Sequence, residues 1–406
     1  MSGSGVVVIG GGQAAVSTAV TLRRLGYGPS ITIIAEEESL PYERPPMSKG
    51  YLVDPATPVT LFGADVYAAQ DITVLAGVAA AGVDPLLRTV STSDGGLLSY
   101  SSLVFATGSR NRTAPWTGAD LAGVHLLRTM ADAEDLGRKL QAGRRVVVVG
   151  GGFVGLEIAS AAASAGCDVT VVEVASQLLG RVLSAPLAEV VAARHRDRGV
   201  RVLTGTRVTA LDGDERVAAV LTDHGRLESD VVVVGIGAVA EDSLADSAGL
   251  KVDDGIVVDE HLRVLGHDDI YAVGDCARFP ESAGGRAVRL ESVQNACDQG
   301  AAVARAIAGS PTPYRDLPWF WSDQGDLKIQ VAGLRLPDDE VHHVVDDAGR
   351  HAAYAIRDGL VVAVETLDWP AEHLAARRVL ASGEATPAAA IQSSTLSALL
   401  RARRSA

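Results

Sequence analysis

Two glycine clusters in the chain have the residue types and surroundings of nucleotide-binding turns. The first comprises Gly10, Gly12 and Ala15, and it follows the apolar, β-branched run 6–9. A glycine turn after a buried strand lets the backbone approach a pyrophosphate, and the helix that starts there offers free N–H groups and a positive dipole end. Glu36 ends the next apolar run, where a carboxylate can accept hydrogen bonds from ribose hydroxyls. These residues predict a dinucleotide site.

The pattern occurs a second time after the apolar run 146–149, and the acid of this second site is Glu173. Glu173 would bind the free 2′-hydroxyl of NADH and repel the 2′-phosphate of NADPH, and the segment 174–177 contains no arginine to bind that phosphate. We therefore expect NADH as the nicotinamide cofactor. The candidate NAD-binding residues are Gly150, Gly152, Phe153, Val154, Gly155, Glu157, Glu173, Arg181 and Gly237.

Each glycine cluster needs a strand before it and a helix and a strand after it. Short, continuously apolar, β-branched runs indicate strands buried on both faces, as in a parallel sheet. Such runs are 6–9 and 31–34 around the first cluster, and 146–149 and 169–172 around the second. The two strand–helix–strand units predict two Rossmann-like dinucleotide-binding domains of an α/β protein.

The last part of the chain, from Trp319, has a different pattern. Apolar and polar residues alternate over 327–331, which indicates a half-buried strand. Asp358-Gly359 between two apolar runs is typical of a type I′ hairpin. Helices are predicted over 371–380 and, with a basic character, over 396–404. We expect a C-terminal α+β domain with an antiparallel sheet.

Composition narrows the possible functions. The 406 residues are 47 % hydrophobic and carry a net charge of −14, which argues against a general nucleic-acid binder. The cysteines Cys167, Cys276 and Cys297 have neither a disulfide-framework nor a metal-ligand spacing, and their number fits a reducing compartment. No run resembles a signal peptide or a membrane span. We expect a cytoplasmic protein without a metal or a membrane partner.

Three further segments resemble hallmarks of one flavoprotein family: 41–52 (PYERPPMSKGYL), 291–296 (ESVQNA) and 319–324 (WFWSDQ). This family comprises the FAD-containing, NADH-dependent ferredoxin reductases that serve bacterial Rieske-type aromatic-ring dioxygenases and cytochromes P450, with putidaredoxin reductase as a relative. The resemblance covers essentially the whole chain and implies a glutathione-reductase-like architecture. The implied domains are a discontinuous FAD-binding domain (1–109 and 239–318), an NAD-binding domain (110–238) and a C-terminal interface domain (319–406).

The resemblance also implies which residues bind FAD. The first glycine cluster and Glu36 would hold its adenosine half, and Arg44 and Lys49 would lie along the flavin and the pyrophosphate. Asp275 would bind the ribityl chain, and the predicted helix 292–307 would direct its positive N-terminus at the flavin. The further FAD-binding residues implied are Ala106, Thr107, Gly108, Glu291, Ser292, Val293 and Trp321.

Three residues are implied to act at the reacting flavin. Glu157 would lie near it and pair with Lys49, the alternative being a solvated glutamate at the start of a helix. Trp321, less so Trp319, would cover the flavin near the nicotinamide pocket, the alternative being a core tryptophan. We therefore take Lys49, Glu157 and Trp321 as the candidate catalytic residues.

The absence of cysteine from one segment limits the reactions that the chain can catalyse. Disulfide reductases of this architecture need a cysteine pair near the flavin, and related NADH peroxidases and oxidases use one cysteine, but the segment 45–50 contains none. Cys276 is interpreted as a small buried hydrophobic residue. We expect hydride transfer from nicotinamide C4 to flavin N5, and then two single-electron transfers to a [2Fe-2S] ferredoxin that feeds a Rieske oxygenase or a cytochrome P450.

Two other functions remain open from the sequence. One is an NADH oxidase or a rubredoxin-type reductase, and the other is a redox-sensing protein that resembles apoptosis-inducing factor. The oligomeric state, monomer or homodimer, is left open by the sequence. Because the chain is acidic overall, a ferredoxin would need a local basic rim. The candidate residues for that rim are Arg286, Arg289, Arg315, Lys328, Arg401, Arg403 and Arg404.

Overall fold

A computed structural model of the protein describes residues 5–280, 286–392 and 394–405. The chain forms two compact units, each built from segments distant in sequence. Unit 1 comprises Met1–Arg44, Val59–Arg110 and Ala238–Asp316, and unit 2 comprises Pro45–Pro58, Asn111–Gly237 and Leu317–Ala406. This division differs from the predicted domain boundaries in placing Pro45–Pro58 with unit 2. The three-domain division stays a prediction.

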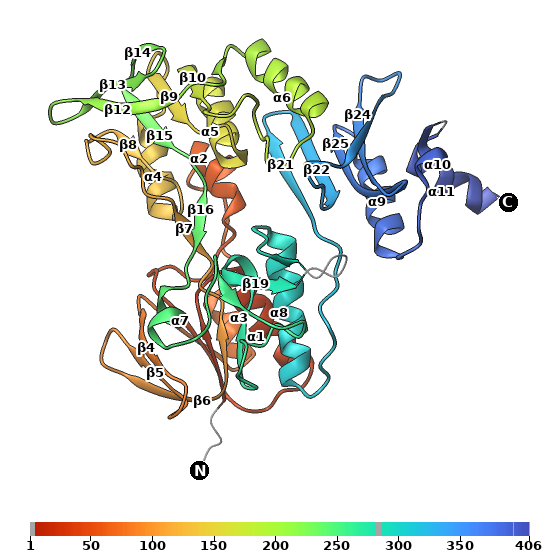
Figure 1. Cartoon of the computed structure of the whole chain (residues 1–406). Coiled ribbons are helices and arrows are strands. Elements are labelled where there is room, and N and C mark those ends of the chain that lie inside the picture. The colour runs from red at the N-terminus through yellow and green to blue at the C-terminus, as the bar shows by residue number, and fades with distance from the viewer. Residues whose placement is uncertain (1–4, 281–285, 393, 406) are drawn as a thin grey trace. The chain divides into compact units, whose positions relative to one another are not determined.

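Unit 1 is built on a seven-stranded sheet, of which Figure 1 labels β4, β5 and β6. Its order is β3 (Ile72–Ala76), β2 (Ile31–Ala35), β1 (Gly5–Ile9), β6 (Leu97–Phe105), β5 (Thr89–Thr92) and β4 (Ala80–Asp84), and β18 (Ile270–Ala272) also pairs with β6. Strands β3, β2, β1, β6 and β18 pair in parallel, and β4 and β5 antiparallel. The two runs around the first glycine cluster are therefore neighbouring parallel strands, as predicted.

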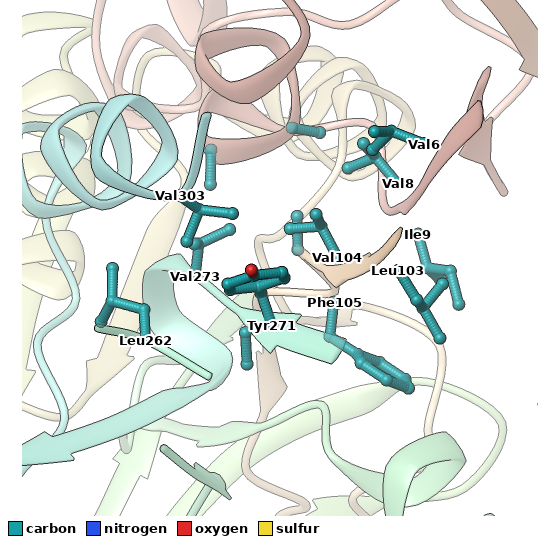
Figure 2. Close-up of a cluster of buried hydrophobic side chains, with 14 of the residues drawn as sticks. Val6, Val8, Ile9, Leu103, Val104, Phe105, Leu262, Tyr271, Val273 and Val303 are labelled. Atoms are coloured by element: carbon teal, nitrogen blue, oxygen red, sulfur yellow. The ribbon is translucent and has the colours of Figure 1, made fainter. Parts of the chain in front are cut away.

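The core of unit 1 lies where these strands meet the helices (Figure 2). Val8, Leu103, Phe105 and Tyr271 from β1, β6 and β18 are at most 5 % exposed. Helices α1 (Gln13–Arg24) and α8 (Val293–Ile307) pack so closely that a Cβ at Gly300 would lie 2.6 Å from the Ala14 carbonyl oxygen. The remaining elements are α3 (Ala64–Ala69), α7 (Ser243–Ser247), β17 (Ile256–Val257), η2 (Gly274–Cys276), β19 (Ala277–Pro280) and β20 (Ala287–Val288).

Unit 2 contains the second parallel sheet. Its order is β11 (Arg201–Leu203), β10 (Asp168–Val172), β9 (Arg145–Val149), β15 (Val231–Val234) and β8 (Val124–His125). An antiparallel sheet of β12 (Val208–Gly213), β13 (Val217–Thr222) and β14 (Gly225–Glu228) follows β11 in the chain. The helical elements are η1 (Pro45–Ser48), α2 (Gly50–Val53), α4 (Met130–Lys139), α5 (Phe153–Ser164) and α6 (Ala185–Asp197). Strand β16 (Ala238–Ala240) belongs to unit 1 and pairs with β7 (Ser109–Asn111), which also begins in unit 1.

The C-terminal part of unit 2 is an antiparallel sheet with helices. Its order is β21 (Trp319–Gln324), β22 (Leu327–Gly333), β25 (Leu360–Leu367), β24 (His351–Arg357) and β23 (Glu340–Val345). The loop between β24 and β25 has φ +52° at Asp358 and +74° at Gly359, as a type I′ turn requires. The helices are α9 (Pro370–Ala381), α10 (Ala388–Gln392) and α11 (Leu396–Ser405). The expected fold class is confirmed.

Candidate dinucleotide and redox site

The first glycine turn, in unit 1, fits a pyrophosphate. A Cβ at Gly10, whose φ is +119°, would lie 2.1 Å from the Ala106 carbonyl oxygen, so no other residue fits without movement. Gly12 is the N-cap of α1, no side chain caps the helix there, and a Cβ at Gly12 would meet nothing within 4 Å. Gly10 N–H donates to the Ile34 carbonyl at 2.8 Å, which holds the turn beside the end of β2, where Glu36 is exposed. The glycine turn and the open N-terminus of α1 therefore suit the pyrophosphate of the dinucleotide that the sequence predicts.

The second glycine turn, in unit 2, has the same geometry with a tighter third position. A Cβ at Gly150 would lie 2.2 Å from the Gly235 carbonyl oxygen. A Cβ at Gly155 would lie 2.3 Å from the Gly150 carbonyl oxygen, whereas the first turn accommodates the methyl group of Ala15 at this position. The N-cap Gly152 again faces open space. Both turns therefore leave their helix N-terminus open to a ligand.

The Glu173 carboxylate lies against the second turn. It accepts hydrogen bonds from the N–H groups of Gly151 at 2.6 Å and Ala175 at 2.7 Å. These two bonds fix the carboxylate at the end of β10, where the ribose of a dinucleotide is expected. The position is consistent with the predicted preference for a free 2′-hydroxyl.

The other candidate NAD-binding residues lie in unit 2 as well. The rings of Phe153 and Phe320 meet edge to face at 5.0 Å, and Val154 is 45 % exposed. The exposed Arg181 reaches Gly237, where a Cβ would lie 3.5 Å from a guanidinium nitrogen. The structure therefore brings Arg181 and Gly237 together, although they are far apart in the sequence.

Asp275 lies in η2, shortly after β18, and its carboxylate is held from the start of β7, which follows the end of β6. Ser109 Oγ donates to Asp275 Oδ2 at 2.9 Å. Thr107 and Gly108 join this strand end to the segment after β16, because Thr107 Oγ1 donates to the Glu241 carbonyl at 2.5 Å and Glu241 N–H donates to the Gly108 carbonyl at 3.0 Å. The two predicted strand-end motifs of unit 1 therefore meet.

Helix α8 begins where the sequence predicts. Ser292 is its N-cap, with Oγ accepting from Asn295 N–H at 3.1 Å, and Val293 is its first residue. Arg289, just before the helix, is 11 % exposed and donates to Glu291 at 2.6 Å and to the Asp275 carbonyl at 3.2 Å. Burial alone would lower the pKa of Arg289, but the Glu291 and Asp254 carboxylates raise it. The prediction of Arg289 as an exposed docking residue is wrong, because its charge is turned inward.

The other basic candidates differ in their surroundings. Lys328 forms an ion pair with Asp323 of the same hairpin at 2.7 Å. Arg286, Arg315 and Arg401 are exposed. The side chains of Arg403 and Arg404 lie outside the part of the chain that the structure describes. Their docking role stays a prediction.

Arg44 is oriented by its own unit. It donates to Glu37 Oε1 at 2.7 Å, and its guanidinium carbon lies 5.3 Å from the centre of the Tyr42 ring. Tyr42 donates to the other oxygen of Glu37 at 2.6 Å. Glu37 therefore positions Arg44, while Glu36 beside it is exposed at the strand end.

The Lys49–Glu157 ion pair implied by the family resemblance is present in unit 2. Lys49 Nζ lies 2.8 Å from Glu157 Oε1, and Glu157 is 6 % exposed. Its carboxylate also accepts from Ser322 at 2.5 Å and from Ser48. The alternative of a solvated glutamate is excluded, since a buried carboxylate needs such partners.

The two tryptophans of β21 stack on each other, with ring centres 5.7 Å apart and 28° between the planes. The Arg377 guanidinium lies 3.6 Å from the centre of the Trp319 ring. Trp319 is thus engaged on one side by α9, and Trp321 is half-buried. Cys276 is fully buried, and burial raises the pKa of its thiol, as expected for a small hydrophobic residue.

Several polar residues at these sites were not assigned a role from the sequence. They are Glu37 beside Arg44, Ser48 and Ser322 on Glu157, and Ser109 on Asp275. Ser48 and Ser322 lie within the hallmark segments 41–52 and 319–324, which was the available signal. Ser109 follows the 106–108 motif directly, but its partner is 166 residues away.

Comparisons with known proteins agree with this arrangement. Residues 4–300 match the family model described as pyridine nucleotide-disulphide oxidoreductase, and residues 319–400 match the reductase C-terminal model. Rhodocoxin reductase of Rhodococcus erythropolis is 41 % identical over 384 residues, covering 93 % of this chain and 89 % of the relative.

Two solved structures have nearly the same fold. The ferredoxin reductase for the CYP199A2 system of Rhodopseudomonas palustris has a TM-score of 0.91 at 35 % identity, covering 95 % of this chain and 96 % of the other. The reductase in the covalent putidaredoxin reductase–putidaredoxin complex has a TM-score of 0.90 at 35 % identity, with 94 % of each chain covered. The chain therefore belongs to the pyridine nucleotide-disulphide oxidoreductase family.

Proposed function

We propose that this protein is an FAD-dependent NADH:ferredoxin oxidoreductase. When bound, FAD would accept a hydride from NADH at N5 and pass its two electrons singly to a one-electron carrier. The turn of Gly10 and Gly12 with Glu36 would hold the adenosine half of FAD, and Asp275 would hold its ribityl chain. The turn of Gly150 and Gly152 would hold NADH.

The protein's own residues then bind, orient and provide charge. The open N-terminus of α5 and the fixed Glu173 carboxylate would orient NADH without a general base. The buried Glu157 would keep Lys49 in place as a fixed positive charge. Trp321 on β21 would cover the flavin, and Arg44 would contact the cofactor in the orientation that Glu37 sets.

One observation supports an external electron acceptor most directly. The segment 45–50 contains no cysteine, and its Lys49 is engaged in an ion pair with Glu157. The chain therefore has two dinucleotide-binding turns, but its segment 45–50 has no pair of thiols that could receive electrons from the flavin. A [2Fe-2S] ferredoxin is the acceptor we propose, since one relative is named a ferredoxin reductase and another occurs in a complex with putidaredoxin.

The ferredoxin would in turn feed a Rieske oxygenase or a cytochrome P450, as the family resemblance implies. A cytoplasmic location is proposed from the three unpaired cysteines. Among the residues that the structure describes, no helix has the length and apolar character needed to cross a membrane.

The test is an acceptor comparison with the FAD-loaded chain. With NADH, consumption should be slow in oxygen alone, rise severalfold on adding a [2Fe-2S] ferredoxin, and survive a thiol-blocking reagent. NADPH should give a lower kcat/KM than NADH. Full turnover with oxygen alone, a rise with rubredoxin only, or an NADH-induced change in oligomeric state without turnover would each contradict the proposal.

A further inference from the structure

A chain of buried hydrogen bonds ends on the Glu157 carboxylate. Ser322 Oγ lies 2.5 Å from Glu157 Oε1, Gln324 Nε2 lies 3.3 Å from Ser322 Oγ, and His195 Nε2 lies 2.7 Å from Gln324 Oε1. All four side chains are at most 6 % exposed. They come from α5, β21 and α6, so three elements of unit 2 contribute to one polar path.

The chemistry of each group fixes the direction of this path. An ionised carboxylate can only accept, so the single hydroxyl proton of Ser322 points to Glu157. Ser322 must then accept from the amide nitrogen of Gln324, and the amide oxygen is left to face His195. His195 therefore carries its proton on Nε2.

The remaining nitrogen of His195 agrees with this assignment. Nδ1 is buried and has no hydrogen-bond partner among the described residues. With the proton on Nδ1 instead, that N–H would be a buried donor without a partner, and the lone pair of Nε2 would face the amide oxygen of Gln324. Burial also lowers the pKa of His195, which keeps the ring neutral.

Gln324, in the middle of the path, is fixed through its backbone as well. Gln324 is the last residue of β21, and its carbonyl oxygen accepts from Arg198 at 2.6 Å. Arg198 follows α6, the helix that also carries His195. Residues at the C-terminal end of α6 therefore bind Gln324 both at its backbone carbonyl and at its side-chain amide.

We infer that Ser322, Gln324 and His195 are positioning residues that hold the Glu157 carboxylate in the orientation in which it binds Lys49. Lys49 is 23 % exposed and on a flexible stem, so it cannot orient the carboxylate alone. Ser48 engages the second oxygen, and Ser322 engages the oxygen that Lys49 uses. The inference rests on the proposed function, in which this pair acts beside bound FAD.

The test uses the FAD-loaded full chain and four variants. Ser322→Ala removes the direct donor, and His195→Leu removes the far end of the path. His195→Gln keeps a donor where ring Nε2 lies. Ser229→Ala is the matched control, since Ser229 is 1 % exposed and gives up one comparable bond, 2.7 Å long, to a backbone carbonyl in the same unit.

Stopped-flow bleaching of the flavin by NADH is the first measurement. Ser322→Ala should slow it about tenfold at saturating NADH, as expected for losing one hydrogen bond to a charged group, with the NADH concentration for half-saturation unchanged. His195→Leu should slow it less, His195→Gln should restore it, and Ser229→Ala should leave it at the wild-type rate. Equal rates for Ser322→Ala and Ser229→Ala, or no rescue by His195→Gln, would overturn the inference.

A second measurement needs no turnover. In protein labelled with ¹⁵N-histidine, the His195 signals, assigned by their loss in His195→Gln, should show a proton on Nε2 and none on Nδ1 near neutral pH. A proton on Nδ1 would reverse the path and overturn the inference. If the wild-type chain fails to reduce a ferredoxin, the proposed function fails instead, and the ¹⁵N result still stands on its own.

Discussion

At the scale of single residues, burial decides what a charge can do. Arg289 joins the Asp275 carbonyl and the Glu291 carboxylate, and both of these residues are candidate FAD ligands. An 11 % exposed guanidinium with such partners holds a loop in place and is not available to a partner protein. The same residue type at Arg315 is exposed. The two arginines therefore have separable roles.

Replacing Arg289 should weaken FAD binding. In Arg289→Gln, the segment before α8 and η2 lose their common link, so we expect FAD to dissociate about tenfold more readily, the effect of one lost hydrogen bond to a charged group. Arg315→Gln is the exposed control and should retain FAD. Flavin fluorescence released on dilution measures both. Equal retention in the two variants would show that Arg289 does not position the site.

The sequence predicted those site residues whose role can be recognised from their spacing within one short segment. Gly10, Gly150 and Glu173 follow from a strand, a turn and an acid within one short segment. The Lys49–Glu157 pair came from the family resemblance, not from spacing. The partners Ser48 and Ser322 lie 109 and 165 residues from Glu157, and no local pattern links such positions.

At the scale of elements, strands were predictable because the apolar runs and the alternation over 327–331 report burial directly. The hairpin at Asp358-Gly359 was predictable because few residues adopt positive φ. The contact between α11 and α9 could not be predicted. The first N–H groups of α11, at Leu396 and Ser397, donate at 2.8 and 3.0 Å to Glu372 of α9, a residue that nothing near 396 in the sequence identifies.

Glu372 should therefore control the stability of the C-terminal helix. Its fully buried carboxylate also accepts from Tyr354 Oη at 2.7 Å. In Glu372→Gln the uncharged amide gives weaker bonds and turns a donor toward backbone N–H groups, so we expect about 1–3 kcal/mol of destabilisation. Limited proteolysis after 392 should become faster than in the exposed control Glu340→Gln. Equal cleavage of the two variants would contradict this role.

At the scale of the whole molecule, the fold class and the family followed from two repeated units and three hallmark segments. The docking surface could not be predicted in this way, because a net charge of −14 does not show where basic side chains lie on the surface. Two of the basic candidates are engaged by acids of their own unit, Arg289 by Glu291 and Lys328 by Asp323. Which arginines stay available depends on pairing in three dimensions.

A property of the whole molecule that follows from buried groups is its sensitivity to acid. Burial is the largest cause of a lowered pKa in five of the nine histidines: His125, His195, His343, His351 and His373. A histidine whose pKa is lower in the folded chain binds more protons when unfolded. Its contribution to stability is therefore present above the ordinary value near 6.5 and is lost as the pH falls toward the folded value.

His373 gives the clearest case. It is 3 % exposed, neither ring nitrogen has a partner among the described residues, and burial together with Arg377 lowers its pKa to about 4. Between pH 7 and 5 the wild-type chain should lose on the order of 2 kcal/mol of unfolding free energy through this ring alone. Urea unfolding followed by tryptophan fluorescence at the two pH values should show a smaller loss in His373→Leu. His224→Leu, at a 69 % exposed ring, should keep the wild-type loss. If His373→Leu keeps the full loss as well, this ring does not set the acid sensitivity of the protein.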